Sequence, residues 1–255
     1  MSDGAVRPLR RVGHMGAGGL VTGNTVASFE RAIEVGVDMV ELDVLWLRDG
    51  SPKTPAASRS PLVIAHDWAD AATRPALTLA TALDAFTRPP LDRVEIDCDL
   101  KLVGREEDLV EALRERGLVE RAMVSTMFTE SLAAIRAIEP ALRLGWTYPR
   151  VTRPWDRNLL ARPILPLALA AMRRRFPAIA RTRAPEIGAA AIWAYHRLIS
   201  PALAEVTRDL GIELIAWTVD DAARVAELRR IGIDGICSND PGILAADARA
   251  EPARS

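Results

Sequence analysis

Two carboxylates stand two residues apart in an apolar run of the sequence, at Glu41 and Asp43. In a β-strand this spacing places both side chains on one face and their apolar neighbours Val40, Leu42 and Val44 on the other. Two carboxylates that point into the same space repel each other, and a hard divalent cation is the usual compensation. Arginine or lysine partners would also compensate them, so the pair alone leaves a metal site and a salt-bridge cluster open.

A second strand-like run, over 93–102, alternates apolar with charged residues. The charged residues of one face are Glu95, Asp97, Asp99 and Lys101. Charges on a buried strand face are costly unless they serve a site. We expect Asp99 to complete a three-carboxylate cation site, with Asp97 as the competing ligand, and Lys101 to meet a phosphate oxygen. An internal salt-bridge network is the expectation for Glu95 and in part for Asp97.

Histidine is rare in this chain, which contains three. His14 ends the first predicted strand, and His66 ends a short strand that follows the Glu41–Asp43 run, so we expect both beside the carboxylates. Two imidazoles suit paired general acid and general base catalysis near neutral pH. His196, which follows Tyr195, is expected to be structural.

Strand-like runs alternate with helix-like segments through most of the chain. The predicted strands end at or cover 12–14, 39–47, 93–102, 122–125, 142–147, 189–195, 213–219 and 235–238. Eight strands with helices between them indicate an α/β fold, a (β/α)8 TIM barrel that forms a single domain over 1–255. Such barrels place their chemistry at the carboxyl ends of the strands.

Two segments depart from this alternation. Residues 62–66 read as a strand, but no helical pattern precedes them, and a parallel crossover needs about a dozen residues that are usually helical. We therefore expect an extra antiparallel strand after strand two. For the proline-rich residues 149–185 we expect a decorated loop with a crossover helix, or a lid whose apolar part, 159–172, meets a lipid-like substrate.

Composition excludes several classes of protein. The 255 residues are 49% hydrophobic and 26% charged, and the mean hydropathy of +0.06 is that of a globular chain. The formal net charge of -1 gives no general attraction to nucleic acid. No signal-peptide or transmembrane pattern is present, and the two cysteines lie far apart, so we expect a cytoplasmic protein without disulfides.

Several short motifs, taken in order, resemble the glycerophosphodiester phosphodiesterase family of phosphatidylinositol-phosphodiesterase-like barrels. The similar runs are 13–16, 24–29, 36–44, 49–50, 63–67, 216–220, 232–236 and 239–241. They cover most of the chain, and their order makes the resemblance much more specific than any single motif. The resemblance implies a barrel fold and cleavage of a phosphodiester with a divalent cation, Ca or Mg.

The same resemblance implies roles by position. The implied metal ligands are Glu41, Asp43 and Asp99, and the implied catalytic pair is His14 and His66. The family usually has glutamate at the place of Asp99. Trp217 resembles a wall of the family's substrate cleft, although a buried core tryptophan would fit the sequence too.

Two residues differ from the family pattern. Met15 replaces the arginine of His-Arg-Gly, and Gly23 replaces the glutamate of Glu-Asn-Thr. Without that arginine, the phosphate must rely on the cation, Lys101 and the backbone amides of residues 16–19. Met15 adds an apolar, pliable surface to the expected substrate cleft.

The predicted function is metal-dependent hydrolysis of small glycerophosphodiesters to glycerol 3-phosphate and an alcohol. One alternative is a lysophospholipase D-like or sphingomyelinase D-like activity on acyl-bearing lysophospholipids, with transient contact to a membrane surface. The other is a catalytically impaired phospholipid-binding module, which the replacements at Met15 and Gly23 suggest.

Overall fold

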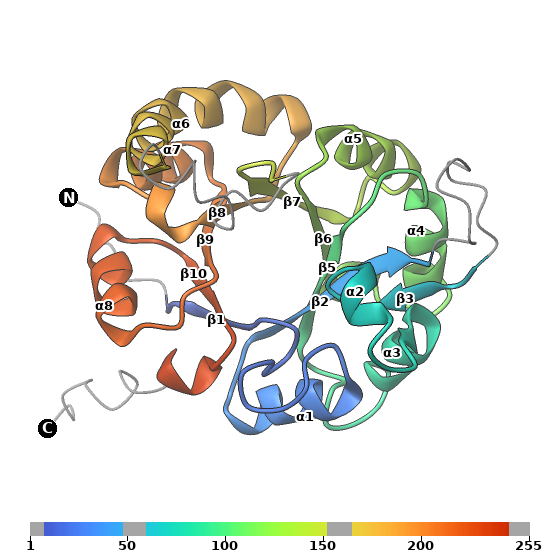
Figure 1. Ribbon diagram of the computed structural model, residues 1–255. Helices are drawn as coiled ribbons and strands as arrows, with labels where there is room; N and C mark the ends of the chain where they lie inside the picture. Colours follow the sequence, from blue (N-terminus) through green and yellow to red (C-terminus); the bar gives the residue numbers. More distant parts are fainter. Residues whose placement is uncertain (1–7, 48–59, 152–164, 245–255) are drawn as a thin grey trace, which may run out of the picture.

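Eight parallel strands close into a barrel at the centre of the protein (Figure 1), as the sequence predicts. The computed structural model describes residues 8–47, 60–151 and 165–244. The strands follow one another in the order β1, β2, β5, β6, β7, β8, β9 and β10, and β10 pairs with β1 to complete the ring. Their bounds are β1 Arg10–Gly13, β2 Met39–Trp46, β5 Glu95–Leu100, β6 Ala122–Thr126, β7 Arg143–Tyr148, β8 Ala191–Tyr195, β9 Glu213–Trp217 and β10 Gly235–Ser238.

Helices link the strands and cover the outside of the barrel (Figure 1). Their bounds are α1 Val26–Glu34, α2 Trp68–Ala71, α3 Leu79–Ala85, α4 Glu106–Arg114, α5 Thr129–Ile138, α6 Leu165–Ile187, α7 Pro201–Leu210 and α8 Ala222–Ile231, with 3-10 turns η1 Val119–Arg121, η3 His196–Leu198 and η4 Pro241–Leu244. Local sequence explains several helix ends. Thr25 and Ser28 form a capping box at the start of α1. Gly211 and Gly232 end α7 and α8 in the left-handed conformation.

Buried side chains fill the space inside and outside the ring of strands. The apolar face of β5 joins a large cluster between strands and helices. The barrel interior is filled by Val12, Met39, Met123, Ala191, Trp193, Ile215 and Cys237. At the amino ends of the strands, Arg10 pairs with Glu95 and Glu213, and Arg143 also pairs with Glu95. Glu95 therefore belongs to an internal salt-bridge network, as predicted.

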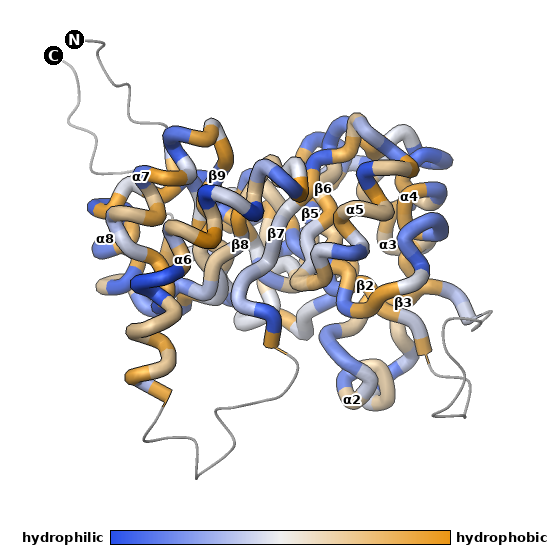
Figure 2. Tube along the Cα trace, turned by 90° about the horizontal axis from the view of Figure 1, so that it is seen from above, coloured by the Kyte–Doolittle hydropathy of each residue, from blue (hydrophilic) through white to orange (hydrophobic). Residues whose placement is uncertain are grey.

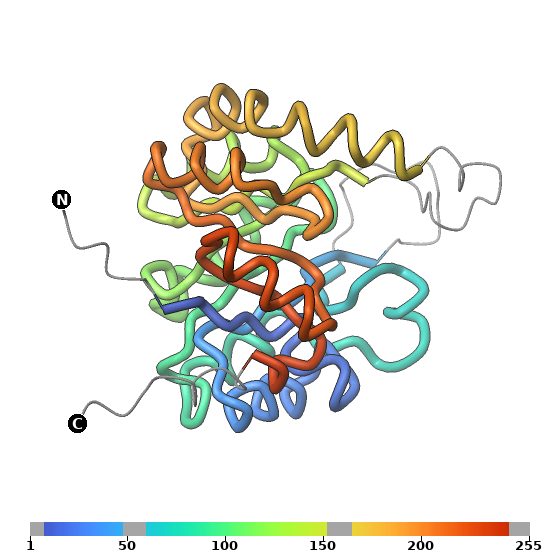
Figure 3. Tube along the Cα trace, turned by 90° about the vertical axis from the view of Figure 1, so that its left-hand side faces the viewer, coloured from blue at the N-terminus to red at the C-terminus, as the bar shows by residue number. Residues whose placement is uncertain are grey.

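The extra antiparallel strand after β2 is confirmed. β3 (Leu62–Ile64) pairs antiparallel with the end of β2, and β4 (Leu77–Thr78) pairs with β3. This excursion, which includes α2, projects beyond the carboxyl ends of the barrel strands (Figure 3). The N–H of Ala65 donates to the carbonyl oxygen of Asp43 at 3.1 Å, so His66 lies next to the end of β2.

Helix α6 is longer than the prolines of residues 149–185 suggest. Residues 152–164 lie outside the described part of the chain, and so does the first half of the apolar segment 159–172. From Leu165 onward the helix is continuous and contains Pro177 and Pro185 in its interior. The crossover helix expected within residues 149–185 is therefore present and runs from Leu165 to Ile187.

Packing against the rest of the barrel explains why α6 persists. Phe176, Ala180 and Ala184 are fully buried on its second half. Its first turns project past the barrel at the same end as α2 (Figure 2), and the Leu167 side chain there is 73% exposed. The start of α6 thus lies at the end of the barrel where chemistry is expected.

Candidate active site

Three carboxylates meet at the carboxyl end of the barrel. Glu41 and Asp43 come from β2 and Asp99 from β5, and the pairing of these strands places Asp43 opposite Asp99. One oxygen of each carboxylate lies within 4.8 Å of the other two. Glu41 and Asp43 are buried, and Asp99 is half-buried. A compact set of oxygen donors fits a hard divalent cation such as Ca or Mg.

Lys101 lies against this cluster and forms ion pairs with Asp43 and Asp99. Burial lowers the pKa of Lys101, but the surrounding carboxylates outweigh burial and hold that pKa well above its ordinary value. Burial also acts to raise the pKa of Asp43, yet Lys101 outweighs it, and the pKa of Asp43 lies below its ordinary value. The pKa of Glu41 is raised well above its ordinary value, first by burial and then by Asp43. The single ammonium of Lys101 therefore does not neutralise the three carboxylates, and a divalent cation would supply the missing positive charge.

Asp97 lies outside the three-carboxylate cluster. Its side chain is fully buried and accepts a hydrogen bond from Ser125 Oγ at 2.7 Å. Burial, followed by the charge of Asp99, raises the pKa of Asp97 well above its ordinary value. A carboxyl group in this setting favours the neutral form, so Asp99 is the better candidate for the third ligand.

The loop between β1 and α1 holds both carboxylates of β2. The Asn24 side chain donates to Asp43 Oδ2 at 2.7 Å and accepts from the Asp43 N–H at 3.2 Å. The Met15 N–H donates to Glu41 Oε2 at 2.8 Å. Met15 and Asn24 have φ of 51° and 57°, a conformation that asparagine tolerates better than methionine. Asn24 is not among the predicted site residues. The feature of the sequence that indicates its role is its residue type, because asparagine tolerates a positive φ.

The two departures from the family pattern touch each other. A Cβ atom added to Gly23 would lie 2.8 Å from the Cβ of Met15 and 3.4 Å from its sulfur. Every residue except glycine has a Cβ atom at position 15, so a side chain at position 23 would require this loop to shift whichever residue stood at position 15. Met15 packs over Gly23 beside its own hydrogen bond to Glu41.

His14 follows β1 and is oriented by residues that follow β9 and β10. His14 Nδ1 lies 2.7 Å from Asn239 Oδ1, and Asn239 Nδ2 donates to Asp220 Oδ2 at 2.6 Å. Because the Asn239 amide nitrogen serves Asp220, its oxygen accepts from His14, and Nδ1 of His14 carries the hydrogen. Nε2 of His14 lies 3.9 Å from Glu41 Oε2. Asn239 and Asp220 are not among the predicted site residues, although their positions after two strand ends are a signal for the site.

His66 enters from the β3–β4 excursion and is more open than His14. The side chain of His66 is 54% exposed, against 18% for His14. Nδ1 of His66 lies 3.4 Å from Asp67 Oδ2, and the backbone N–H of His66 donates to Asp70 Oδ2 at 3.0 Å. His14 and His66 also lower the pKa of Asp43, although burial and Lys101 have larger effects on it. The structure thus brings both histidines near the carboxylates.

Trp217 ends β9 and is half-buried. Its indole N–H donates to the carbonyl oxygen of Trp193 at 3.0 Å, and its ring centroid lies 5.6 Å from that of Tyr195. The ring packs against the apolar cluster inside the barrel. Trp217 therefore contributes to the core and still presents surface at the carboxyl end.

Comparison with known proteins identifies the family. The sequence profile of the glycerophosphoryl diester phosphodiesterase family matches residues 14–54 and 91–243. The chain belongs to this family. It is therefore a phosphoric diester hydrolase, and the match includes His14 and the three carboxylates.

A relative agrees with the family assignment, and solved structures share the fold. A glycerophosphodiester phosphodiesterase of Caldanaerobacter subterraneus is 26% identical over 91% of this chain and 95% of its own length. A glycerophosphodiester phosphodiesterase structure from Parabacteroides distasonis has a TM-score of 0.71 at 17% identity, and covers 97% of this chain and 100% of its own. An Oleispira antarctica phosphodiesterase in complex with its product sn-glycerol-3-phosphate has a TM-score of 0.66 at 17% identity, covering 95% of this chain and 97% of its own. Within the described residues, no helix is long and apolar enough to cross a membrane.

Proposed function

We propose that the protein hydrolyses glycerophosphodiesters to glycerol 3-phosphate and an alcohol with a divalent cation. The observation that carries this proposal is the convergence of Glu41, Asp43 and Asp99, whose oxygens lie within 4.8 Å of one another at the carboxyl end of the barrel. The Caldanaerobacter relative is a glycerophosphodiester phosphodiesterase, and the Oleispira structure holds sn-glycerol-3-phosphate as its product. Both support the same substrate class for this chain.

In this proposal Glu41, Asp43 and Asp99 hold the cation, Ca or Mg. The bound cation supplies positive charge to the phosphate, which stabilises the charge that develops during cleavage. Lys101, which lies between Asp43 and Asp99, contributes a second positive group that can bind a phosphate oxygen. Met15 and Trp217 contribute apolar surface for the rest of the substrate.

His14 and His66 carry out the proton transfers in this proposal. One imidazole removes a proton from the attacking group, which is water or a neighbouring hydroxyl of the substrate, and the other protonates the leaving alcohol. Asn239 fixes the tautomer of His14, so that Nε2 is free to accept a proton. His66 is exposed enough to exchange its proton with solvent between turnovers.

Turnover of glycerophosphocholine tests the proposal directly. The wild-type chain is incubated with Ca, with Mg and with a chelator, and released glycerol 3-phosphate is measured enzymatically. We expect product with at least one cation and none with the chelator. An Asp99→Asn variant serves as the control for cation binding, because it keeps the size of the side chain and removes its charge. No phosphate-containing product from glycerophosphocholine or lysophosphatidylcholine would instead favour the phospholipid-binding module.

Hydrolysis of acyl-bearing lysophospholipids is a second candidate, favoured by the distribution of exposed apolar side chains. Among the described residues, the large exposed apolar side chains lie in segments that follow the barrel strands β1, β2, β5 and β7 or, for Trp68, in the β3–β4 excursion: Leu20, Leu47, Trp68, Val103, Val151 and Leu167. Covering such a surface with an acyl chain or a membrane contributes about 25 cal/mol per Å² of apolar area. Transient contact of this end with a membrane would bring lysophospholipids to the site.

Comparing kcat/KM for lysophosphatidylcholine and glycerophosphocholine decides between the two substrate classes. The second candidate predicts at least equal efficiency for lysophosphatidylcholine and a selective loss of that activity in Leu167→Asp. Ala178→Asp is the matched control, because it adds the same charge to an exposed position of α6 roughly 16 Å further along the helix. A clear preference for glycerophosphocholine would contradict the second candidate.

We also propose a cytoplasmic location. Cys98 and Cys237 are free and buried, and unpaired cysteines suit a reducing compartment. Fractionation of cells that express the full chain, followed by immunoblotting, tests this location.

A further inference from the structure

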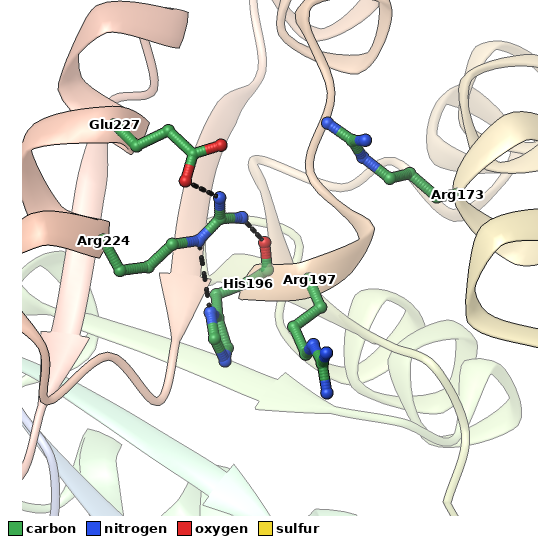
Figure 4. A pocket seen from close by; sticks show the side chains of 5 residues that line it. All are labelled: Arg173, His196, Arg197, Arg224 and Glu227. Atoms are coloured by element: carbon green, nitrogen blue, oxygen red, sulfur yellow. Dashed lines mark hydrogen bonds and ion pairs between the residues drawn. The ribbon is translucent and has the colours of Figure 1, made fainter. Parts of the chain in front are cut away.

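A positively charged pocket lies beside the barrel, and none of the three carboxylates lines it (Figure 4). It is lined by Arg173, His196, Arg197, Arg224 and Glu227. Its volume of about 240 Å³ is far above the roughly 10–15 Å³ that, on the same measure, holds one water molecule. Because η3 follows β8 directly and Arg224 lies in the first turn of α8, the pocket opens near the carboxyl ends of β8 and β9.

Arg224 forms the framework of this pocket. Its Nε donates to His196 Nδ1 at 3.3 Å, one terminal nitrogen donates to the His196 carbonyl oxygen, and another pairs with Glu227 at 2.6 Å. Burial, followed by Arg224, lowers the pKa of His196, so the imidazole is neutral near pH 7. Since Nδ1 accepts from Arg224, Nε2 of His196 carries the hydrogen and remains a donor.

Arg173 and Arg197 provide hydrogen-bond donors in addition to those of Arg224. Figure 4 shows Arg173 on one side of the pocket, with Arg224 and Glu227 on the other. Arg173 Nε donates to the Ile199 carbonyl oxygen at 2.9 Å. Within the described part of the chain, the terminal nitrogens of Arg173 and the guanidinium of Arg197 form no hydrogen bond or ion pair.

The charge of the pocket selects the class of ligand. Three guanidinium groups and one carboxylate leave a net charge of two positive units around a neutral histidine. A phosphomonoester carries about −1.5 to −2 near pH 7, whereas a carboxylate or a phosphodiester carries a single negative charge. The planar fork of arginine binds phosphate oxygens in pairs, which adds geometry to the charge.

We propose that this pocket is a second anion site that binds a soluble phosphomonoester, independently of the catalytic centre. The Tyr195 ring contacts both His196 and Trp217, with centroids 4.9 Å and 5.6 Å away, so one side chain connects the pocket to the proposed substrate cleft. The volume of about 240 Å³ gives room for a small molecule, which favours a soluble ligand over a flat membrane surface.

Calorimetric titration of the full chain with glycerol 3-phosphate and with inorganic phosphate tests the proposal. A chelator is present throughout, so that no cation in the catalytic centre contributes to binding of the anion. We expect Arg197→Ala and Arg173→Ala each to weaken binding by about tenfold or more. Arg175→Ala is the matched control, since Arg175 is exposed on the same helix and does not line the pocket.

Three outcomes would overturn this second site. They are the absence of binding in the chelated wild type, equal affinities of the Arg197→Ala and Arg175→Ala variants, and equal affinity for dimethyl phosphate, which has one negative charge. Sedimentation with phosphatidic acid vesicles tests whether the phosphomonoester belongs to a lipid. Binding to these vesicles without binding of soluble phosphate would contradict the proposal that the ligand is a soluble molecule. Turnover of glycerophosphocholine by Arg197→Ala is measured separately, so that failure of the proposed catalytic function can be distinguished from failure of the second anion site.

Discussion

Replacing Asn239 with leucine removes the hydrogen-bond acceptor of His14 and keeps the size of the side chain. Asn239 Oδ1 lies 2.7 Å from His14 Nδ1, and His14 becomes charged each time it takes up a proton. A hydrogen bond to a charged group contributes about 1.5–3 kcal/mol. Since 1.36 kcal/mol corresponds to a tenfold change in rate, we expect kcat to fall by about 10- to 160-fold.

Initial rates on glycerophosphocholine at saturating cation measure this loss. KM should stay near the wild-type value, because Asn239 contacts His14 and Asp220 rather than the carboxylate cluster. Asp240→Leu is the matched control: Asp240 supports the same turn by accepting from the Gly242 N–H at 3.0 Å, without contacting His14. Unchanged kcat in Asn239→Leu, or an equal loss in Asp240→Leu, would refute the orienting role.

Three further predictions concern catalysis, the cation and packing. His14→Ala and His66→Ala should each lower kcat by at least about 100-fold with an unchanged circular dichroism spectrum; near-normal turnover in either variant would contradict the two-histidine mechanism. Chelation should abolish turnover and added Ca or Mg should restore it, with one ion bound by the three carboxylates at about 2.0–2.6 Å in a soaked crystal. Gly145→Ala should lower the free energy of unfolding by about 1–3 kcal/mol, because its Cβ would lie 2.7 Å from Trp193 Nε1 and 2.9 Å from Ser125 Cβ; thermal denaturation measures this change.

The carboxylate cluster can be predicted from the sequence because it depends on the alternation of apolar and charged residues along two strands. Glu41 and Asp43 share a face of one strand, and Asp99 lies on the charged face of another. Once two such strands are parallel neighbours, Asp43 comes to lie opposite Asp99. The barrel itself follows from the repeated order of strands and helices.

Other features depend on contacts that one sequence does not reveal. Asn239 lies 225 positions after His14, and only the pairing of β10 with β1 brings the two together. Pro177 and Pro185 favour a helix break locally, but burial of neighbouring side chains such as Phe176 stabilises α6 through them. The charged pocket at His196 combines residues of α6, η3 and α8, which no short motif connects.

The pairing of β1 with β10 brings the first and the last barrel strands to be synthesised together in one site. During synthesis on the ribosome His14 emerges early, but its acceptor Asn239 emerges only when the barrel is nearly complete. Joining such distant segments costs entropy and slows folding. A fragment that stops before β10 leaves two sheet edges open, and open edges recruit other chains into aggregates. Enzymatic activity in a translation reaction therefore reports on finished, ring-closed molecules and gives no signal from incomplete ones.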